Sequence, residues 1–486
     1  MKNSKLVEIM RTLSKQEMKS FEKLIRSPYF NIERDVTGLF SLLKRNHPDF
    51  ESPEITKENL QKALFPGENS GSKKLANTIG ELTRLADKFL IFGYLNSNPV
   101  ESELFLAAQY SERQTEKLFS RSLKALGKRM DENPLDSISI FKFEEKYTQL
   151  KREYHVSMNE YDDALKAHRE YIEYRTLAFF VFFFRTLHDQ IRVKKSYKSA
   201  LDNMLFDTVM ENIDFEKILS KLKKKKYPML WLIEMYYNCY MSVYNANNEK
   251  FFYRFRELFT ENIDKFSHRE KYFIFCDFLS FCILRENMGD HSFAKEEFKI
   301  YKEMMERNIY CSSEKDYMNL MLYRNVMFLA LSLKEHAWLA EFITEFSKKL
   351  KPEYRDAARF FSTAHLDFAR GNFELAMENI GMINYDLDIY KLDVRNLLLK
   401  IFYELSLFDQ AFSLVETYRW YLRDTEDMSD AYKVQFKNFI KVYPALLRAK
   451  INNDHSSLNN LTYEINKLKA LHARNWLLEK VEEIKK

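Results

Sequence analysis

GNFELAM (371–377) is a short stretch that this chain repeats with small changes. NEYDDAL (159–165) and SLFDQAF (406–412) are similar, and GDHSFAK (289–295) is a looser copy. Each copy begins with a turn residue, usually has an aromatic residue two positions later, and has an alanine at its sixth position. Glycine and asparagine in such turns tolerate a left-handed backbone. The pattern predicts pairs of antiparallel helices that join at the turn and cross closely at the alanine.

The composition predicts an all-α protein. The 486 residues include only 9 glycines and 9 prolines. Turn-rich β sandwiches and phosphate-binding α/β sheets need more glycine for their special backbone angles. A chain of this length is also too long for one ordinary compact domain. We therefore expect either several helical domains or one elongated stack of helices.

Charge, cysteine usage and hydropathy predict a soluble cytoplasmic protein without a membrane partner. The net charge of +5 is mild and neither requires nor excludes an anionic partner. The four cysteines form no CxxC pair and lie among apolar residues, as expected for reduced core thiols. No signal peptide opens the chain. The most apolar run, LAFFVFFF (177–184), is far too short to cross a bilayer.

The chain divides into a helical head at residues 1–95 and a longer helical region at residues 96–486. The head contains five short amphipathic segments, at residues 6–13, 15–27, 35–47, 56–65 and 72–95. LNSNPVES (95–102) is a loop-like stretch that marks the boundary between the head and the longer region. Beyond it, most breaks between helices lie 20 to 40 residues apart. This is the spacing of helix pairs in a solenoid.

The recurring turns resemble the tetratricopeptide repeat, a helix–turn–helix unit of 34 residues. The resemblance is most specific over residues 330–425, and as architecture it extends over roughly residues 140–480. The matching positions are Phe360, Ala364, Gly371, Phe373, Ala376 and Ile380 in one unit, and Leu398, Leu399, Phe402, Phe408, Ala411 and Val415 in the next. The resemblance implies an irregular α-solenoid. The alternative is a non-repetitive helical array. The last segment, 458–486, would form a terminal helix whose Trp476, Leu477 and Val481 face inward.

A superhelix of helix pairs has a concave groove lined by the first helix of each pair. In the two clearest units the expected groove positions are Phe361, His365, Phe368, Asn396, Lys400 and Tyr403. Ala358 should also face this groove. Such a mixed aromatic and basic surface suits a peptide or helix with acidic and apolar residues. The resemblance therefore implies a non-enzymatic scaffold or adaptor that binds a protein or peptide.

Catalytic patterns are absent from the sequence. It contains no GxxxxGK[ST], GxGxxG, HExxH, GxSxG or DxDxDG motif. The ten histidines are scattered, so no metal site, cofactor or enzymatic activity is predicted. The basic run KLKKKKYP (221–228) is typical of a solvated helix end, where cations are favoured by the helix dipole.

A second resemblance gives an alternative function. Residues 35–90 are similar to the helix-turn-helix half of bacterial transcriptional activators of the antibiotic-regulator type. The resemblance implies that Lys73, Lys74, Asn77 and Arg84 lie on the helix that enters the DNA groove. The glycine-rich β wing of that family is missing, and residues 1–95 carry 16 Lys and Arg against 12 Asp and Glu. This head is therefore either a DNA-binding domain attached to a helical-repeat sensor or a cap for the solenoid.

Overall fold

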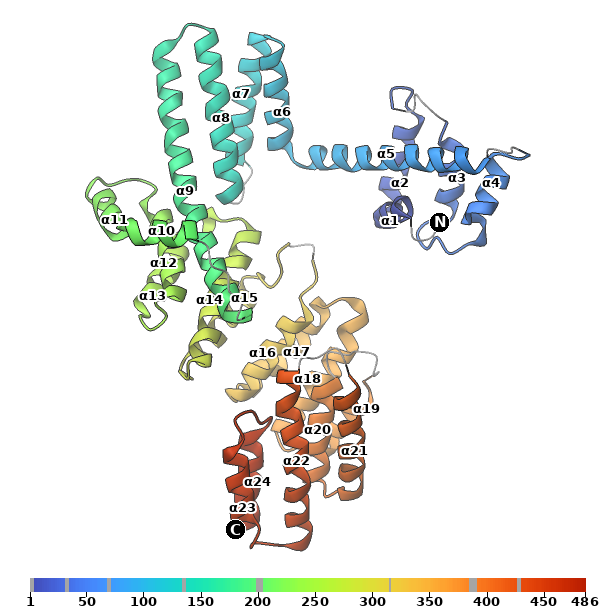
Figure 1. Ribbon diagram of the computed structural model, residues 1–486, viewed down its shortest axis with the longest axis vertical. Coiled ribbons are helices and arrows are strands. Elements are labelled where there is room, and N and C mark those ends of the chain that lie inside the picture. Colours follow the sequence, from blue (N-terminus) through green and yellow to red (C-terminus); the bar gives the residue numbers. More distant parts are fainter. Residues whose placement is uncertain are drawn as a thin grey trace. The chain divides into compact units, whose positions relative to one another are not determined.

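The protein is all-α in the residues that the structure describes. The computed structural model describes residues 4–30, 35–67, 71–132, 137–197, 204–313, 316–383, 391–425 and 430–486. In these ranges it has 24 α-helices, a few short 3₁₀ turns and no strand (Figure 1). The predicted fold class is thus confirmed at the level of all-α. Contacts divide the chain into two compact units, Met1–Phe182 and Phe183–Lys486, and the division falls inside α9 (Tyr161–Tyr197).

The head consists of five helices that match the five predicted segments. They are α1 (Lys5–Thr12), α2 (Lys15–Arg26), α3 (Thr37–Arg45), α4 (Lys57–Leu64) and α5 (Gly71–Ser97). Local signals set their starts: the Ser14 hydroxyl accepts from the Glu17 amide, and the Glu17 carboxylate accepts from the Ser14 amide. The first four helices gather around the N-terminal half of α5 (Figure 1). Phe21 and Phe40 form the centre of this small core and are fully buried.

Antiparallel helices make up the rest of the first unit. They are α6 (Pro99–Glu112), α7 (Glu116–Glu132), α8 (Ser137–Ser157) and the first part of α9 (Figure 1). The NEYDDAL turn joins α8 to α9, and its Asn159 has φ of +60°. Ala164 is buried close to this turn. The turn predicted from the sequence is confirmed here.

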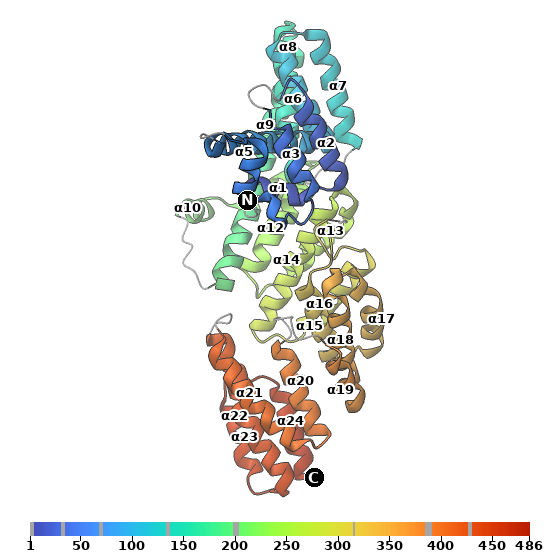
Figure 2. The same cartoon turned by 90° about the vertical axis from the view of Figure 1, so that its right-hand side faces the viewer.

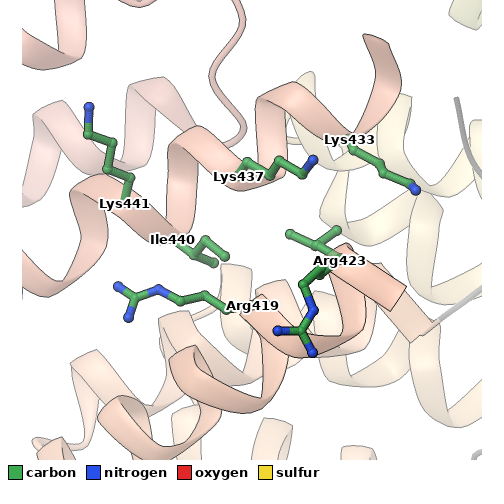
Figure 3. Close-up of a pocket in the computed structure, with 7 residues that line it drawn as sticks. Arg419, Arg423, Lys433, Lys437, Ile440 and Lys441 are labelled. Carbon is green, nitrogen blue, oxygen red and sulfur yellow. The ribbon is translucent and has the colours of Figure 1, made fainter. Parts of the chain in front are cut away.

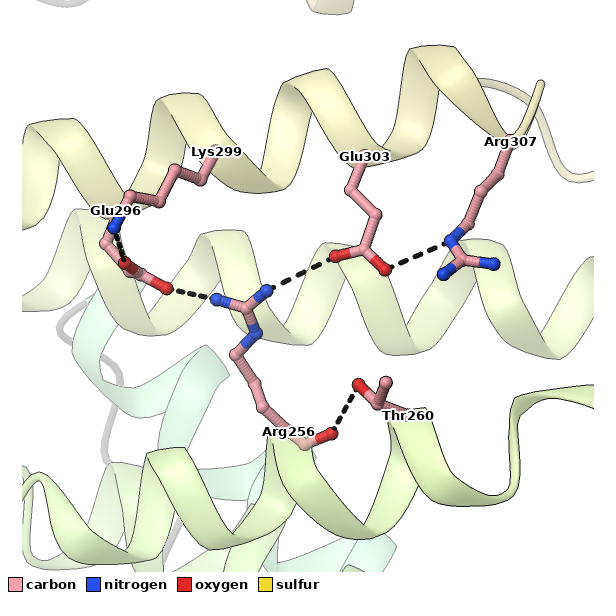
Figure 4. Close-up of polar contacts among 6 residues, drawn as sticks. All are labelled: Arg256, Thr260, Glu296, Lys299, Glu303 and Arg307. Atoms are coloured by element: carbon pink, nitrogen blue, oxygen red, sulfur yellow. Dashed lines mark hydrogen bonds and ion pairs between the residues drawn. The ribbon is translucent and has the colours of Figure 1, made fainter.

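The first half of the second unit is held by aromatic packing and by ion pairs between its helices. Its helices are α10 (Met204–Asn212), α11 (Phe215–Lys224), α12 (Leu230–Tyr244), α13 (Lys250–Glu261), α14 (His268–Asn287) and α15 (Phe293–Glu306). Rings of α13 and α14 stack closely, and the Phe252 and Phe281 centroids are 4.4 Å apart. Arg256 of α13 bridges Glu296 and Glu303 of α15, at 3.2 Å from Glu303 (Figure 4). The basic run after Lys221 is exposed at the end of α11, as predicted.

The second half of this unit contains three consecutive helix hairpins and a C-terminal group. Its helices are α16 (Leu320–Ser332), α17 (His336–Phe346), α18 (Arg355–Ala369), α19 (Phe373–Gly381), α20 (Lys391–Glu404), α21 (Phe408–Asp424), α22 (Asp430–Asn452), α23 (Leu458–Lys467) and α24 (Arg474–Lys485). The hairpin turns contain Lys334, Gly371 and Ser406, with φ of +60°, +82° and +56°. Ala376 and Ala411 are fully buried in the second helices. Helices α20 to α24 lie side by side (Figure 2).

Several expectations about this half are wrong. The segment 458–486 forms two helices instead of one, although Leu477 and Val481 are fully buried as predicted. Ala358 does not face an open groove and is completely buried, because α18 packs against α16, α17, α19 and α20. The sequence also indicates a break between helices at NYDLDI (384–389), and these residues lie outside the described part of the chain.

The four cysteines are free, and Cys239, Cys282 and Cys311 are buried. Among the described helices, none is both long enough and apolar enough to cross a bilayer.

Candidate functional site

A pocket of about 310 Å³ is formed by the first helices of the three hairpins, α16, α18 and α20. The loop between α23 and α24 closes one side of it with His472. Phe328 of α16 and Phe368 of α18 are among its walls, and Asp393 lines it from α20. The first helices of three successive hairpins therefore share one concave site, which we call the hairpin pocket.

Four of the six predicted groove residues line the hairpin pocket: His365, Phe368, Asn396 and Lys400. They come together because they occupy one face of α18 and the facing side of α20. Phe361 and Tyr403 do not line it and are almost fully buried, so their assignment to an open groove is wrong. The reason is long-range packing. The Phe361 ring lies 4.6 Å from the ring of His365, and Tyr403 lies beneath Trp476 of α24, at 5.2 Å between ring centroids.

An ion pair that sequence reasoning missed braces the hairpin pocket. Arg324 of α16 donates to both carboxylate oxygens of Asp393 on α20, at 2.6 and 2.9 Å. Its guanidinium also lies over the Phe328 ring, with the carbon 4.6 Å from the centroid. The Asp393 side chain is only 7% exposed. Because this bidentate pair is charge-balanced, it fixes α16 to α20 without adding net charge to the site.

Two buried nitrogen atoms of the hairpin pocket have no hydrogen-bond partner among the described residues. Asn396 is 3% exposed, and its Oδ1 accepts from the Tyr418 hydroxyl at 3.1 Å. This bond orients the amide, yet its Nδ2 is unpaired. The Nε2 of His365 is also unpaired. Leaving such a group unsatisfied typically costs about 1–3 kcal/mol, so each one calls for a partner.

Lys400 brings an uncompensated positive charge to the hairpin pocket. Among the described residues it forms no ion pair, and its Nζ lies 5.8 Å from the Trp476 ring centroid. Burial lowers the pKa of Lys400 to about 8, against the opposing effect of Asp393. Burial, together with Lys400 and Arg324, lowers the pKa of His365 and of His472 to about 3. At neutral pH both imidazoles are therefore neutral, and Lys400 is mostly protonated.

The proposed DNA-contacting residues all lie on α5 in the head. Lys73, Lys74 and Asn77 are exposed near its N-terminus. Arg84 lies further along and donates to Glu81 on the same helix, with 2.9 Å between Nε and Oε2. No strand follows α5 in the described part of the first unit. The structure thus places three of these side chains toward solvent, and it pairs the fourth with a carboxylate.

A buried cluster that joins α9, α12 and α14 contains His188, Cys239 and Asp277, whose ligand atoms lie within 4.8 Å of one another. The His188 Nδ1 is 3.8 Å from Asp277 and 3.9 Å from Asp189. Burial favours a lower pKa for His188, but Cys239 and both carboxylates hold it well above its usual value. Burial also raises the pKa of the Cys239 thiol. The group offers three possible ligands, fewer than the four that a structural zinc site uses, so core packing explains it better.

A surface group at the NEYDDAL turn contains His155, Glu160 and Asp163. His155 bonds to Glu160 at 2.8 Å, and Asp163 accepts from Lys166 at the same distance. Each side chain has a local partner. The arrangement is that of a capped, solvated helix start.

Two other pockets differ in chemistry from the hairpin pocket. The first, of about 380 Å³, lies between α21 and α22, where cationic side chains surround Ile440 (Figure 3). Arg419 and Arg423 are exposed and pair with carboxylates of their own helix, whereas the Lys433 Nζ donates to a backbone carbonyl. The second pocket, of about 630 Å³, is apolar and includes Phe105 of α6. Among the residues that the structure describes, neither pocket contains a buried unpartnered nitrogen atom.

Comparison with protein-family models, curated proteins and solved structures found no significant match. The functional argument therefore rests on the chemistry of the site alone.

Proposed function

We propose that this protein is a non-enzymatic scaffold or adaptor that binds a peptide or protein segment at the hairpin pocket. The observation that carries this proposal is the meeting of His365, Phe368, Asn396 and Lys400 in one pocket shared by three hairpins. Phenylalanine walls beside a cation suit a segment that contains apolar and acidic residues. Further support comes from the imidazoles, because bases with a pKa of about 3 are poor proton acceptors near neutral pH.

Selection from a random peptide library against the immobilised full-length protein tests this function. Enriched peptides should carry Asp or Glu next to apolar residues. Lys400→Glu should lose this preference because it reverses the charge of the pocket. Lys437→Glu, on the exposed surface of α22, is the matched control and should keep it. Enrichment without acidic residues, or the same enrichment with Lys400→Glu, would reject the proposal.

The alternative is a DNA-binding regulator whose second unit acts as a sensor. It is supported by the exposure of Lys73, Lys74 and Asn77 on one helix of the head. Such binding should weaken steeply as salt rises, because phosphate contacts release counterions. In a gel-retardation assay with genomic fragments at low salt, Lys73→Glu combined with Lys74→Glu should remove the shifted band. A wild-type protein that retards no fragment at low salt rules this function out.

A further inference from the structure

We infer that the hairpin pocket is a receptor for a single carboxylate, in which Lys400 Nζ supplies the counter-charge and Asn396 Nδ2 and His365 Nε2 supply hydrogen bonds. In the proposed scaffold, on which this inference rests, the carboxylate is that of an Asp or Glu side chain of the bound segment. A free organic acid carries the same chemistry, and the experiment below separates the two sources.

The first argument is the charge of the pocket. The charges of Arg324 and Asp393 cancel in their bidentate pair. His365 and His472 are neutral at pH 7. Lys400 is thus the one cation of the pocket lining without a carboxylate partner among the described residues. Buried charges in proteins are normally paired, so the missing partner is one negative charge.

The second argument is the pair of unpartnered nitrogen atoms. Asn396 Nδ2 and His365 Nε2 are buried, belong to residues that line the same pocket as Lys400, and have no hydrogen-bond partner among the described residues. The imidazole nitrogen donates in the neutral tautomer that carries its proton on Nε2. The Tyr418 hydroxyl already occupies the other end of the Asn396 amide, so Nδ2 is held as a preformed donor. A carboxylate has two oxygens and about four acceptor positions. This number of acceptor positions is enough for both nitrogen atoms and the Lys400 ammonium.

The third argument is the size and lining of the pocket. A volume of about 310 Å³ is at the lower end of the range for small-molecule sites. Phe328 and Phe368 offer aromatic faces, and Leu397 adds an aliphatic surface. These walls suit the one or two methylene groups that separate a carboxylate from a peptide backbone.

The charge count also selects a carboxylate over a phosphate group. A phosphate monoester carries nearly two negative charges at neutral pH. Lys400 can balance only one of them, because Arg324 is already neutralised by Asp393. A second, unbalanced negative charge in a desolvated site is costly. We therefore expect the site to reject phosphate.

Binding should be linked to the proton on Lys400. The titratable and charged groups that face this amine are Asp393 on its own helix, Arg324 on α16, His365 on α18 and His472 on the α23–α24 loop. A bound carboxylate adds a second negative neighbour, which raises the pKa of Lys400 from about 8. Carboxylate affinity should therefore fall as pH rises through 8, and binding above this pH should take up protons.

The experiment uses the full-length protein, chloride buffer of constant ionic strength, and three probes: sodium acetate, N-acetyl-glutamate α-amide and inorganic phosphate. Binding is followed by tryptophan fluorescence, because Trp476 lies 5.8 Å from Lys400 Nζ, and by the thermal unfolding midpoint. The two carboxylates should change both signals, and phosphate should act like chloride. Lys400→Met should weaken the carboxylate response by about tenfold or more, as for the loss of a charge-assisted hydrogen bond. Lys437→Met should respond like wild type.

The outcomes separate this inference from the scaffold proposal. A Lys400-dependent response to acetate without any enriched peptide supports a receptor for free organic acids and rejects the scaffold. Enriched peptides without a carboxylate response reject the carboxylate receptor and leave the scaffold standing. An unchanged response in Lys400→Met, or a stronger response to phosphate, overturns the inference. If Lys400→Met does not fold, Lys400→Arg and Asn396→Leu replace it: the first should keep carboxylate binding and the second should weaken it.

Discussion

Lys400→Met should stabilise the protein in the absence of a bound acid. This substitution keeps a long unbranched side chain at a position where wild type holds a cation with no ion-pair partner among the described residues. The folded state must hold that charge away from water, whereas the unfolded chain hydrates it freely. Removing the ammonium therefore removes a cost that only the folded state bears.

The magnitude follows from the pKa of Lys400, which falls from 10.5 to about 8 on folding. Each pKa unit corresponds to about 1.4 kcal/mol, so the full shift represents at most about 3.5 kcal/mol. Part of the side chain is exposed toward the pocket, and solvent screens the charge there. We expect a gain of about 1–3 kcal/mol in the free energy of unfolding at pH 7.

The pH dependence has a definite sign. Below pH 8 both the folded and the unfolded states hold the proton, so the cost is fully present. Between pH 8 and 10.5 folded Lys400 is neutral while unfolded lysine is still charged, so the wild type gains stability as pH rises. The advantage of Lys400→Met should therefore shrink as pH approaches 10.5.

Urea unfolding at pH 7 and pH 10, in chloride buffer free of carboxylates, measures this difference. Lys437→Met removes an exposed lysine from α22 and should change stability by less than about 0.5 kcal/mol at either pH. A loss of stability in Lys400→Met at pH 7, or an advantage of equal size at both pH values, would refute the reasoning about an uncompensated buried charge.

Three other predictions concern neighbouring parts of the second unit. The free energy of unfolding should fall as pH drops from 6.5 toward 3, because His365 and His472, with pKa values of about 3, stay neutral in the folded state but take up protons in the unfolded chain. Urea titrations at several pH values should show a weaker acid dependence in His365→Leu than in wild type. Ala376→Leu should lower the free energy of unfolding by about 1–3 kcal/mol, because leucine overpacks a buried helix contact, and amide exchange should become faster only within 355–425. Ala445→Leu, at an exposed position, should change neither stability nor amide exchange. Asp393→Leu should lower the free energy of unfolding by about 3–5 kcal/mol, because it leaves its arginine partner without a counter-charge. Equal thermal unfolding midpoints of variant and wild type would contradict this.

Within the second unit, the residues that make the pocket show why only part of it was predictable. His365, Phe368, Asn396 and Lys400 follow from helical periodicity, because positions one or two turns apart on a helix share a face. The pairing of Arg324 with residue 393 joins positions 69 apart in the chain, and no local pattern marks it.

The sequence by itself determined the all-α class, the five helices of the head and several of the turns. Ser14 caps α2, Gly371 turns with φ of +82°, and the alanine of GNFELAM is buried, because these features depend on backbone conformation and on neighbours a few residues away. Only the tertiary structure decided which faces are open. It buried Tyr403 under Trp476 of the returning C-terminal helix and closed the pocket with His472. The burial of a side chain depends on all the segments that pack around it, and many of these are far away in the sequence. The direction of α24 is set by such packing, which no short stretch of sequence encodes.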